Sequence, residues 1–212
     1  MKYIKKNLEP SQFSKWKSTH PGASYKDDLC NFNDSSARAA RIALKRSLLA
    51  EQKYICCYCE CRITDATSHI EHFRPKDASQ FPQLQLDYSN LLASCTKTPT
   101  GSLDEHCGHK KGNFFSTDLV SPQEVDCSSH FGYMMDGSIC GLDDRGNITI
   151  QKLHLDSALL DTKRKMLIDY FLGFDDVDEL QQEIEDYLNE NGSQLGEFFT
   201  MIEFLYSNGQ FF

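Results

Sequence analysis

One short stretch dense in cysteine constrains this chain more than any other feature. Residues 56–74, CCYCECRITDATSHIEHFR, hold four cysteines and two histidines within nineteen positions. Close thiols form disulfides in oxidising compartments and bind metal in reducing ones. The chain has nine cysteines, an odd number that disulfides cannot pair completely. The stretch therefore indicates a metal site whose remaining ligands lie elsewhere in the chain.

The sequence also indicates the compartment in which these thiols reside. It has no run of about 18 apolar residues, so no transmembrane helix is expected. The start, MKYIKKNLEP, lacks the apolar stretch of a signal peptide. We therefore predict a cytoplasmic protein with reduced cysteines and no membrane partner.

Charge is distributed unevenly along the 212 residues. The formal net charge is −9, with 25% charged and 40% hydrophobic residues, as in a globular protein of one or two domains. Residues 166–212 contain eleven acids and no lysine or arginine, which leaves +2 for residues 1–165. Such asymmetry indicates contact with nucleic acid or with a protein partner. A solvated acidic helix face is the alternative explanation.

Four cysteines have a spacing that suits a structural zinc ion. Tetrahedral zinc takes four nitrogen or sulfur ligands, usually as two close pairs. Cys56 and Cys59 form a CxxC pair, and Cys95 and Cys107 are the best candidates for the second pair. The ion would hold the two halves of a small core together and supply part of its folding free energy.

The sequence leaves other assignments of the cysteines open. Cys57 and Cys61 compete for the first half of the site, and His106 is able to replace a cysteine in the second half. Buried free cysteines without a metal ion are a further alternative. We interpret the isolated cysteines as small core residues: Cys30, Cys127 and Cys140.

A second group of polar residues lies between and just after the cysteine pairs: Glu71-His72, Asn90 and His109-Lys110-Lys111. A neutral imidazole accepts a proton from water near pH 7, and a carboxylate binds a hard divalent ion such as Mg²⁺. An amide orients the imidazole or ligates the ion, and a lysine holds a phosphate. Gathered around one point, these groups supply what phosphodiester hydrolysis requires.

Three motifs in this order, HIEHFRPK, LDYSNLLASC and CGHKKGN, resemble those of zinc-bearing HNH endonucleases with a ββα-metal core. Together with the flanking LLAEQKYICCYCE and LHLDSALLDTKRK, they resemble the PtuB-like family. Members of that family are encoded beside an ATPase in Septu anti-phage defence systems and in related retron cassettes. The resemblance covers roughly residues 1–170 and excludes the acidic C-terminal part.

The resemblance implies a role for each matching position. His72 matches the general base, Glu71 the acidic metal ligand and Asn90 the middle asparagine. The zinc cysteines of the family are matched by the same four residues that the spacing favours: Cys56, Cys59, Cys95 and Cys107.

The third ligand of the catalytic metal departs from the family pattern. Many relatives place a histidine or asparagine directly after the last cysteine, but this chain has Gly108 there. We expect His109 in this role, with Asn113 as the second choice, about one helical turn later.

Basic residues near the motifs are expected to line the phosphate path: Arg74, Lys76, Lys110 and Lys111. A solvated role is the alternative for each of them. His69 lies three residues before His72, so in a strand the two face opposite sides, and His69 receives at most a supporting role. The other histidines have no companions in the sequence and receive no role: His20, His130 and His154.

Periodic patterns predict where the helices and strands lie. The predicted helices cover residues 34–52, 153–174 and 175–192. Residues 68–75 are predicted as a strand, and residues 131–150 as a hairpin that includes an Arg-Gly-Asn turn. Residues 193–212 are apolar almost all round and are expected to be buried in the body or against a partner.

The expected fold class is α+β, with a zinc-stabilised ββα-metal core embedded in a mainly helical chain. We divide the chain into an N-terminal helical segment, the HNH core, a hairpin and helix that pack on the core, and acidic and aromatic helices for partner docking. The corresponding bounds are 1–53, 54–120, 121–174 and 175–212.

The expected function is that of a metal-dependent HNH endonuclease in anti-phage defence, working with an ATPase partner of the PtuA type. Zinc would be structural and Mg²⁺ or Mn²⁺ catalytic, and the resemblance implies 5′-phosphate and 3′-hydroxyl products. DNA is the expected substrate, with RNA as an alternative because nothing in the sequence indicates contact with a 2′-hydroxyl. Two other functions stay open: an RNA-cleaving (tRNA) toxin nuclease and a non-catalytic, zinc-stabilised adaptor.

Overall fold

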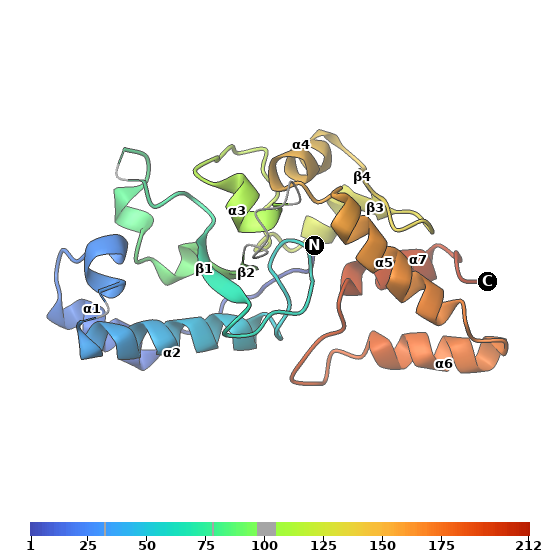
Figure 1. The fold of residues 1–212 in the computed structure, drawn as a ribbon, viewed down its shortest axis with the longest axis horizontal. Coiled ribbons are helices and arrows are strands. Elements are labelled where there is room, and N and C mark those ends of the chain that lie inside the picture. The colour runs from blue at the N-terminus through green and yellow to red at the C-terminus, as the bar shows by residue number, and fades with distance from the viewer. Residues whose placement is uncertain (32, 78, 97–104) are drawn as a thin grey trace.

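Short two-stranded sheets and longer helices make up this molecule (Figure 1). The computed structural model describes residues 1–31, 33–77, 79–96 and 105–212. The mixture of helices and small sheets confirms the predicted α+β class. Within the described residues, no helix is both long and apolar enough to cross a membrane.

The N-terminal part is built on helix α2 (Ser35–Glu51), which forms where the alanine and leucine stripe predicts it. The Asp34 carboxylate accepts hydrogen bonds from the backbone N–H groups of Ser36 and Ala37 and so caps the helix. The stripe packs on α1 (Ser11–Thr19), a helix that the sequence did not reveal. Three aromatic residues of this segment are buried: Phe13, Trp16 and Tyr25.

The middle of the chain forms the antiparallel pair β1 (Ser68–His72) and β2 (Leu91–Cys95). In its register, Ser68 lies opposite Cys95 and His72 opposite Leu91. The short helix α3 (Cys107–Lys111) contacts β2. Three short helices line the connections: η1 (Tyr25–Leu29), η2 (Pro82–Leu84) and η3 (Tyr88–Asn90).

The predicted hairpin is shorter than residues 131–150. Strands β3 (Phe131–Tyr133) and β4 (Ile139–Gly141) pair around Gly137, whose φ of +88° suits the turn. The Arg-Gly-Asn triplet lies instead in α4 (Asp144–Leu153), because Asp143 caps this helix by accepting from the N–H of Gly146. The prediction of a turn at that triplet was therefore wrong.

The helix predicted over residues 153–174 begins later than expected. Helix α4 ends at Leu153, His154 adopts a left-handed conformation with φ of +52°, and α5 (Ala158–Phe171) starts after the cap Ser157. A short helix, η4 (Cys127–His130), precedes the hairpin.

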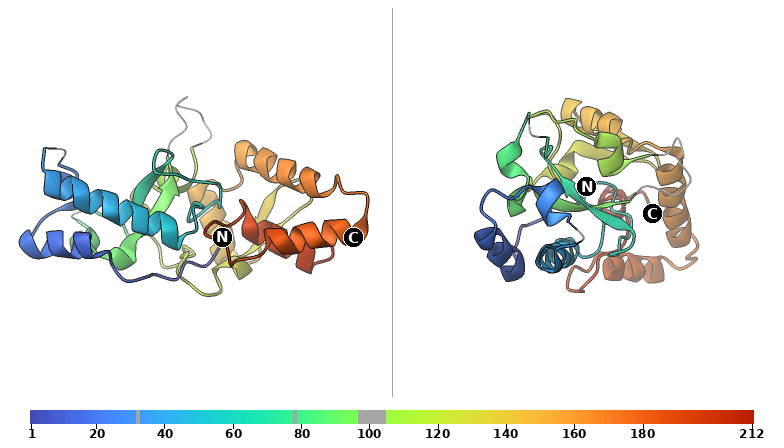
Figure 2. Two further views of the ribbon diagram at one scale, coloured as in Figure 1. Left: turned by 90° about the horizontal axis from the view of Figure 1, so that it is seen from below. Right: turned by 60° about the vertical axis from the view of Figure 1, so that its left-hand side comes forward.

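The C-terminal part contains an acidic and an apolar helix. Helix α6 (Val177–Tyr187) buries only Leu180 and Ile184 and exposes its acids. Helix α7 (Phe199–Ser207) is largely buried, as its apolar sequence predicts. Figure 2 shows both helices at the end of the molecule opposite α1 and α2, with the β1–β2 region between the two ends.

The C-terminal part is joined to the cysteine-rich turn by hydrogen bonds. Leu195 N donates to Lys53 O at 3.1 Å, and Thr200 N donates to Glu60 Oε2 at 2.8 Å. The apolar residues of α7 therefore pack inside the body, whereas the outer face of α6 is exposed.

Candidate metal and catalytic site

The four predicted zinc cysteines converge on one point. Their sulfur atoms all lie within 4.8 Å of one another. Cys56 Sγ lies 3.7 Å from Cys95 Sγ and 3.8 Å from Cys107 Sγ, and Cys59 Sγ lies 4.0 Å from Cys95 Sγ. Ligands at about 2.3 Å from a tetrahedral zinc are about 3.8 Å apart, so donor type and spacing both fit such an ion.

Local backbone geometry brings the two halves of this cluster together. Cys56 N donates to Cys61 O at 2.9 Å, which closes a tight turn that contains the CxxC pair. Cys95 ends β2 and Cys107 begins α3, so the strand and the helix supply the second pair. Because all four positions are thiols, the cluster is closed, as in structural metal sites.

The other thiol candidates stay outside the cluster. Burial, followed by the neighbouring Cys56 thiol, raises the pKa of Cys57 well above its usual value. The four mutually close sulfur atoms include those of neither Cys57 nor Cys61. His106 lies at the edge, with Nδ1 3.1 Å from Cys107 Sγ.

Glu71 occupies the face of β1 that points toward α3. It is 6% exposed, and its Oε1 lies 3.0 Å from Lys111 Nζ and accepts from the Tyr58 hydroxyl at 3.2 Å. Its Oε2 lies 3.2 Å from His69 Nε2. Burial opposes ionisation, but His69 and Lys111 outweigh it and lower the pKa of Glu71 below its ordinary value. The carboxylate is therefore ionised inside the protein.

His69 joins Glu71 on this face, which the sequence reasoning overlooked. Residues two apart in a strand share a face, so the spacing of 69 and 71 carried the signal. The His69 ring also contacts the His109 ring, with centroids 4.5 Å apart. A Cβ at Gly108 would lie 2.4 Å from Glu71 Oε2 and 2.8 Å from His69 Nε2. The missing side chain at position 108 therefore lets α3 approach these two residues.

His72 occupies the opposite face of β1, toward η1. Its Nε2 lies 3.0 Å from Gln85 O, and its ring packs edge-on against Tyr25 with centroids 4.5 Å apart. A carbonyl only accepts, so Nε2 carries the hydrogen, and Nδ1 has no hydrogen-bond partner among the described residues. Burial, aided by nearby Lys76, lowers the pKa of His72 to about 4. The ring is therefore neutral near pH 7.

Asn90 lies beside His72 in the fold but directs its amide elsewhere. Its Oδ1 accepts from Arg74 N at 2.8 Å, and its Nδ2 donates to Arg74 O at 2.9 Å and Leu84 O at 3.1 Å. These bonds clamp the loop between β1 and β2. The structure thus gives Asn90 a loop-holding position, and none of these three hydrogen bonds reaches His72 or Glu71.

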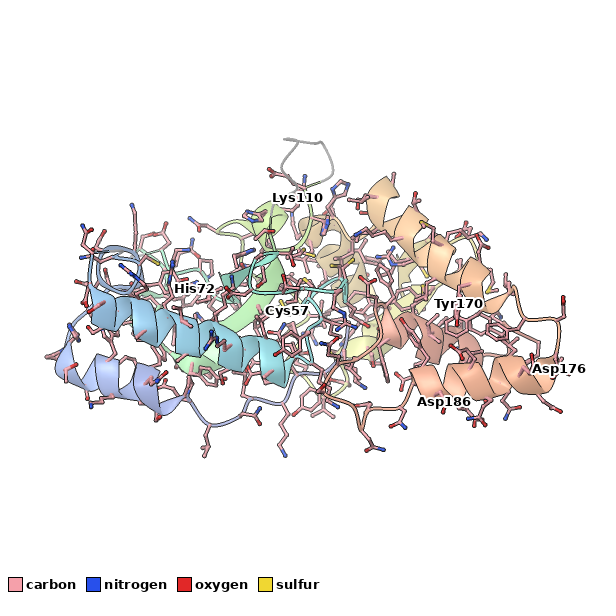
Figure 3. All side chains as sticks on the ribbon, turned by 60° about the horizontal axis from the view of Figure 1, so that its bottom comes forward. Cys57, His72, Lys110, Tyr170, Asp176 and Asp186 are labelled. Atoms are coloured by element: carbon pink, nitrogen blue, oxygen red, sulfur yellow. The ribbon has the colours of Figure 1, made fainter. Side chains whose placement is uncertain are left out.

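Of the predicted phosphate-binding residues, one is buried and three are exposed. Lys111 is 4% exposed and its ammonium contacts Glu71 and His72 O, so it does not line a solvent-facing path. Lys110 is exposed on α3 (Figure 3). The Arg74 guanidinium lies over the Phe81 and Phe115 rings.

Two further candidates are placed by their contacts. Lys76 Nζ lies over the Tyr25 ring, 5.4 Å from its centroid and close to His72. Asn113 Nδ2 donates to Asp77 Oδ2 at 3.3 Å. Asn113 is exposed on the loop after α3, whereas the His109 ring lies beside the His69 ring.

Comparison with known proteins adds two relatives, and no family model matches the chain. Septu protein PtuB of Bacillus thuringiensis is 34% identical over 116 residues, covering 53% of this chain and 40% of the relative. A retron Vc95 protein of Vibrio cholerae serotype O1 biovar El Tor, named as an HNH endonuclease, is 30% identical over 126 residues, covering 56% of this chain and 60% of the relative. The chain therefore spans about half the length of these curated relatives. Both matches confirm the resemblance to the Septu- and retron-associated HNH proteins that the motifs predict.

Proposed function

We propose that this protein is a metal-dependent HNH endonuclease that hydrolyses nucleic-acid phosphodiester bonds in anti-phage defence. The names of the two relatives support this assignment. The observation that carries it is the state of the His72 ring. The imidazole is neutral, its Nε2 contacts the Gln85 carbonyl, and its Nδ1 has no partner among the described residues. Such a ring is oriented to take a proton from water.

In this proposal His72 is the general base. Gln85 O holds the tautomer, so the lone pair that accepts the proton is on Nδ1. Nδ1 is buried and the Tyr25 ring packs against the imidazole, so neighbouring residues must shift before substrate and water reach this nitrogen. Asn90 supports the base indirectly, by holding the loop that carries Gln85 and Leu84.

A catalytic Mg²⁺ or Mn²⁺ would be held by Glu71 and His109, with His69 as an added ligand candidate and Asn113 as the alternative. The 3.2 Å between Glu71 Oε2 and His69 Nε2 fits neighbouring ligands of one ion at about 2.1 Å each. When bound, the ion would neutralise charge on the phosphate oxygens. The Lys111 ammonium, which contacts the other carboxylate oxygen, keeps Glu71 ionised.

The scaffold of this site is the ββα-metal arrangement of HNH enzymes. In chain order it would consist of β1, β2 and α3, with a structural zinc ion on the four cysteines. Glu71 and His72 are the last two residues of β1 and point to opposite faces of the strand. Their side chains therefore lie on the two sides of the same strand end. We place the reacting phosphate at that end.

The substrate would be DNA, with RNA as the alternative. Arg74, Lys76 and Lys110 are the basic side chains left to contact phosphates once Lys111 is assigned to the interior. The chain as a whole carries −9, so its unassisted affinity for nucleic acid is expected to be low. An ATPase partner of the PtuA type would then supply recognition.

That partner would dock on the acidic outer face of α6. Asp176 and Asp186 lie at the end of the molecule away from His72 (Figure 3). Because α7 is part of the core, charge reversal tests this better than truncation. Glu179→Lys with Asp186→Lys should abolish copurification with the ATPase and keep the nuclease activity of the isolated chain. Unchanged copurification would contradict the docking proposal.

The nuclease proposal is tested with the purified chain, with Mg²⁺ or Mn²⁺, and with DNA and RNA offered separately, with and without the ATPase. His72→Gln should abolish cleavage while zinc content and the thermal unfolding midpoint stay close to those of the parent. His154→Gln is the matched control and should cleave normally. Cleavage by His72→Gln at the parental rate would overturn the assignment, and a preference for RNA would favour a toxin ribonuclease.

A non-catalytic adaptor is the second candidate, and the internal pairing of the motif residues favours it. Glu71 is ion-paired with Lys111, and Asn90 is occupied with backbone groups. An adaptor predicts no cleavage by the parent chain with any substrate, metal or ATPase combination. It also predicts that zinc removal, but not His72→Gln, abolishes partner binding.

A further inference from the structure

A second cluster of metal-ligating side chains lies just before and within η4, separate in its residues from the cysteine site. Glu124, Asp126 and His130 each offer one ligand atom, and the three atoms lie within 4.8 Å of one another. The sequence alone did not indicate any ligand partner for His130, because Asp126 and Glu124 stand four and six residues before it. The turn through η4 brings them together.

The state of the His130 ring itself points to a ligand. The residue is 8% exposed, its Nδ1 lies 2.6 Å from Asp143 Oδ2, and its Nε2 has no hydrogen-bond partner in the described part of the chain. The carboxylate only accepts, so Nδ1 carries a hydrogen, and Nε2 is the ring nitrogen left to offer a lone pair to an ion. Metal-ligating histidines commonly donate their other N–H to a carboxylate in this way.

The local charge also matches that of a divalent cation. Glu124, Asp126 and Asp143 are three carboxylates, and Arg145 Nη2 lies 2.8 Å from each carboxylate oxygen of Glu124. The three carboxylates and the Arg145 guanidinium have formal charges that sum to −2. Asp126 is exposed, so an ion can reach the cluster from solvent.

We propose that Glu124, Asp126 and His130 bind a divalent transition-metal ion such as Zn²⁺ or Mn²⁺, with Asp143 orienting the histidine. One imidazole and two carboxylates form a mixed nitrogen and oxygen set, which suits these ions better than an all-oxygen site for Mg²⁺ or Ca²⁺. The site does not depend on the nuclease chemistry proposed above.

The bound ion would fasten the segment before η4 to the start of α4. Glu124 also lines a cavity of about 500 Å³ together with Arg74 and Asn90. Gln123 Nε2 donates to Ser89 O at 2.7 Å, which connects the same segment to the loop before β2. The ion would therefore stiffen one wall of that cavity.

The test is a titration of the full chain with Zn²⁺ alone, in Mg²⁺-free buffer and with the cysteine site already loaded. Ring nitrogens of ¹⁵N-labelled histidines are observed by NMR, and the His130 signals are assigned by their loss in His130→Asn. The Nε2 signal of His130 should shift saturably with one added equivalent. Because each histidine gives its own NMR signals, zinc binding at His69 or His109 is distinguished from zinc binding at His130.

The decisive variant is Asp126→Asn, since the exposed side chain can be changed without disturbing the core. It should weaken the His130 response by more than about tenfold. Asp136→Asn removes an exposed acid from the β3–β4 turn and should leave the response unchanged. A His130 signal that does not move in the parent, or that saturates equally in Asp126→Asn, would overturn the proposal.

Discussion

The two faces of strand β1 treat adjacent polar residues in opposite ways. On the α3 face, Glu71 is ionised and both carboxylate oxygens have partners: Lys111, Tyr58 and His69. On the η1 face, His72 is neutral, and one ring nitrogen lacks a partner among the described residues. The alternation of a strand thus separates a buried ion pair from a buried neutral imidazole with an unpartnered nitrogen.

The largest effect is expected on the α3 face, from Lys111→Met. This variant leaves the Glu71 carboxylate buried with its cation removed, which costs about 3–5 kcal/mol of unfolding free energy. Urea unfolding measures the loss. Adding Glu71→Gln should recover most of it, because the uncompensated charge is then gone. A Lys111→Met protein as stable as the parent would show that the ion pair is not what compensates Glu71.

The η1 face should show a dependence of stability on pH. The usual pKa of histidine is 6.5, and that of His72 in the fold is about 4. As pH falls below 6.5, the unfolded chain takes up the proton first, so this stabilisation is complete above pH 6.5 and is lost toward pH 4. The loss amounts to about 3 kcal/mol.

This loss is measured as the difference between the parent and His72→Gln, with unfolding free energies recorded from pH 7 to pH 4. The subtraction removes contributions shared by the two proteins, including those of the cysteine site. Identical pH profiles in the two proteins would mean that His72 is protonated in the fold as easily as in the unfolded chain.

The smallest effect concerns the approach of α3 to Glu71. Gly108→Ala places a methyl group 2.4 Å from Glu71 Oε2, so the helix or the carboxylate must shift, at about 1–3 kcal/mol. Thermal unfolding measures the loss. Gly192→Ala is the matched control, since its nearest atom would be 3.3 Å away and the expected change is small. Equal midpoints for the two variants would show that this contact is loose.

The features that the sequence predicts well depend on local pattern or ligand chemistry. Spacing and donor type favour Cys56, Cys59, Cys95 and Cys107 without excluding other assignments, and the structure brings these four together. Helix α2 (Ser35–Glu51) lies within the helix that periodicity predicts over residues 34–52. The apolar composition of residues 193–212 predicts the burial of α7.

The features that the sequence misses depend on tertiary contacts. Lys111 looks like a surface lysine until α3 packs on β1 and places its ammonium on Glu71. The Asn90 amide is drawn to the Arg74 backbone by the fold of the loop. The grouping of His130 with Glu124 and Asp126 needs the turn through η4, which no periodicity reports.

The contact between Glu60 and Thr200 has a consequence for biosynthesis. The Glu60 carboxylate sits in the metal-binding turn and is 2% exposed, yet two of its hydrogen bonds come from a residue 140 positions later. On the ribosome, the turn can therefore assemble its thiols long before this acid finds those donors. A nascent chain interrupted before residue 200 would carry the Glu60 carboxylate without either of the Thr200 donors.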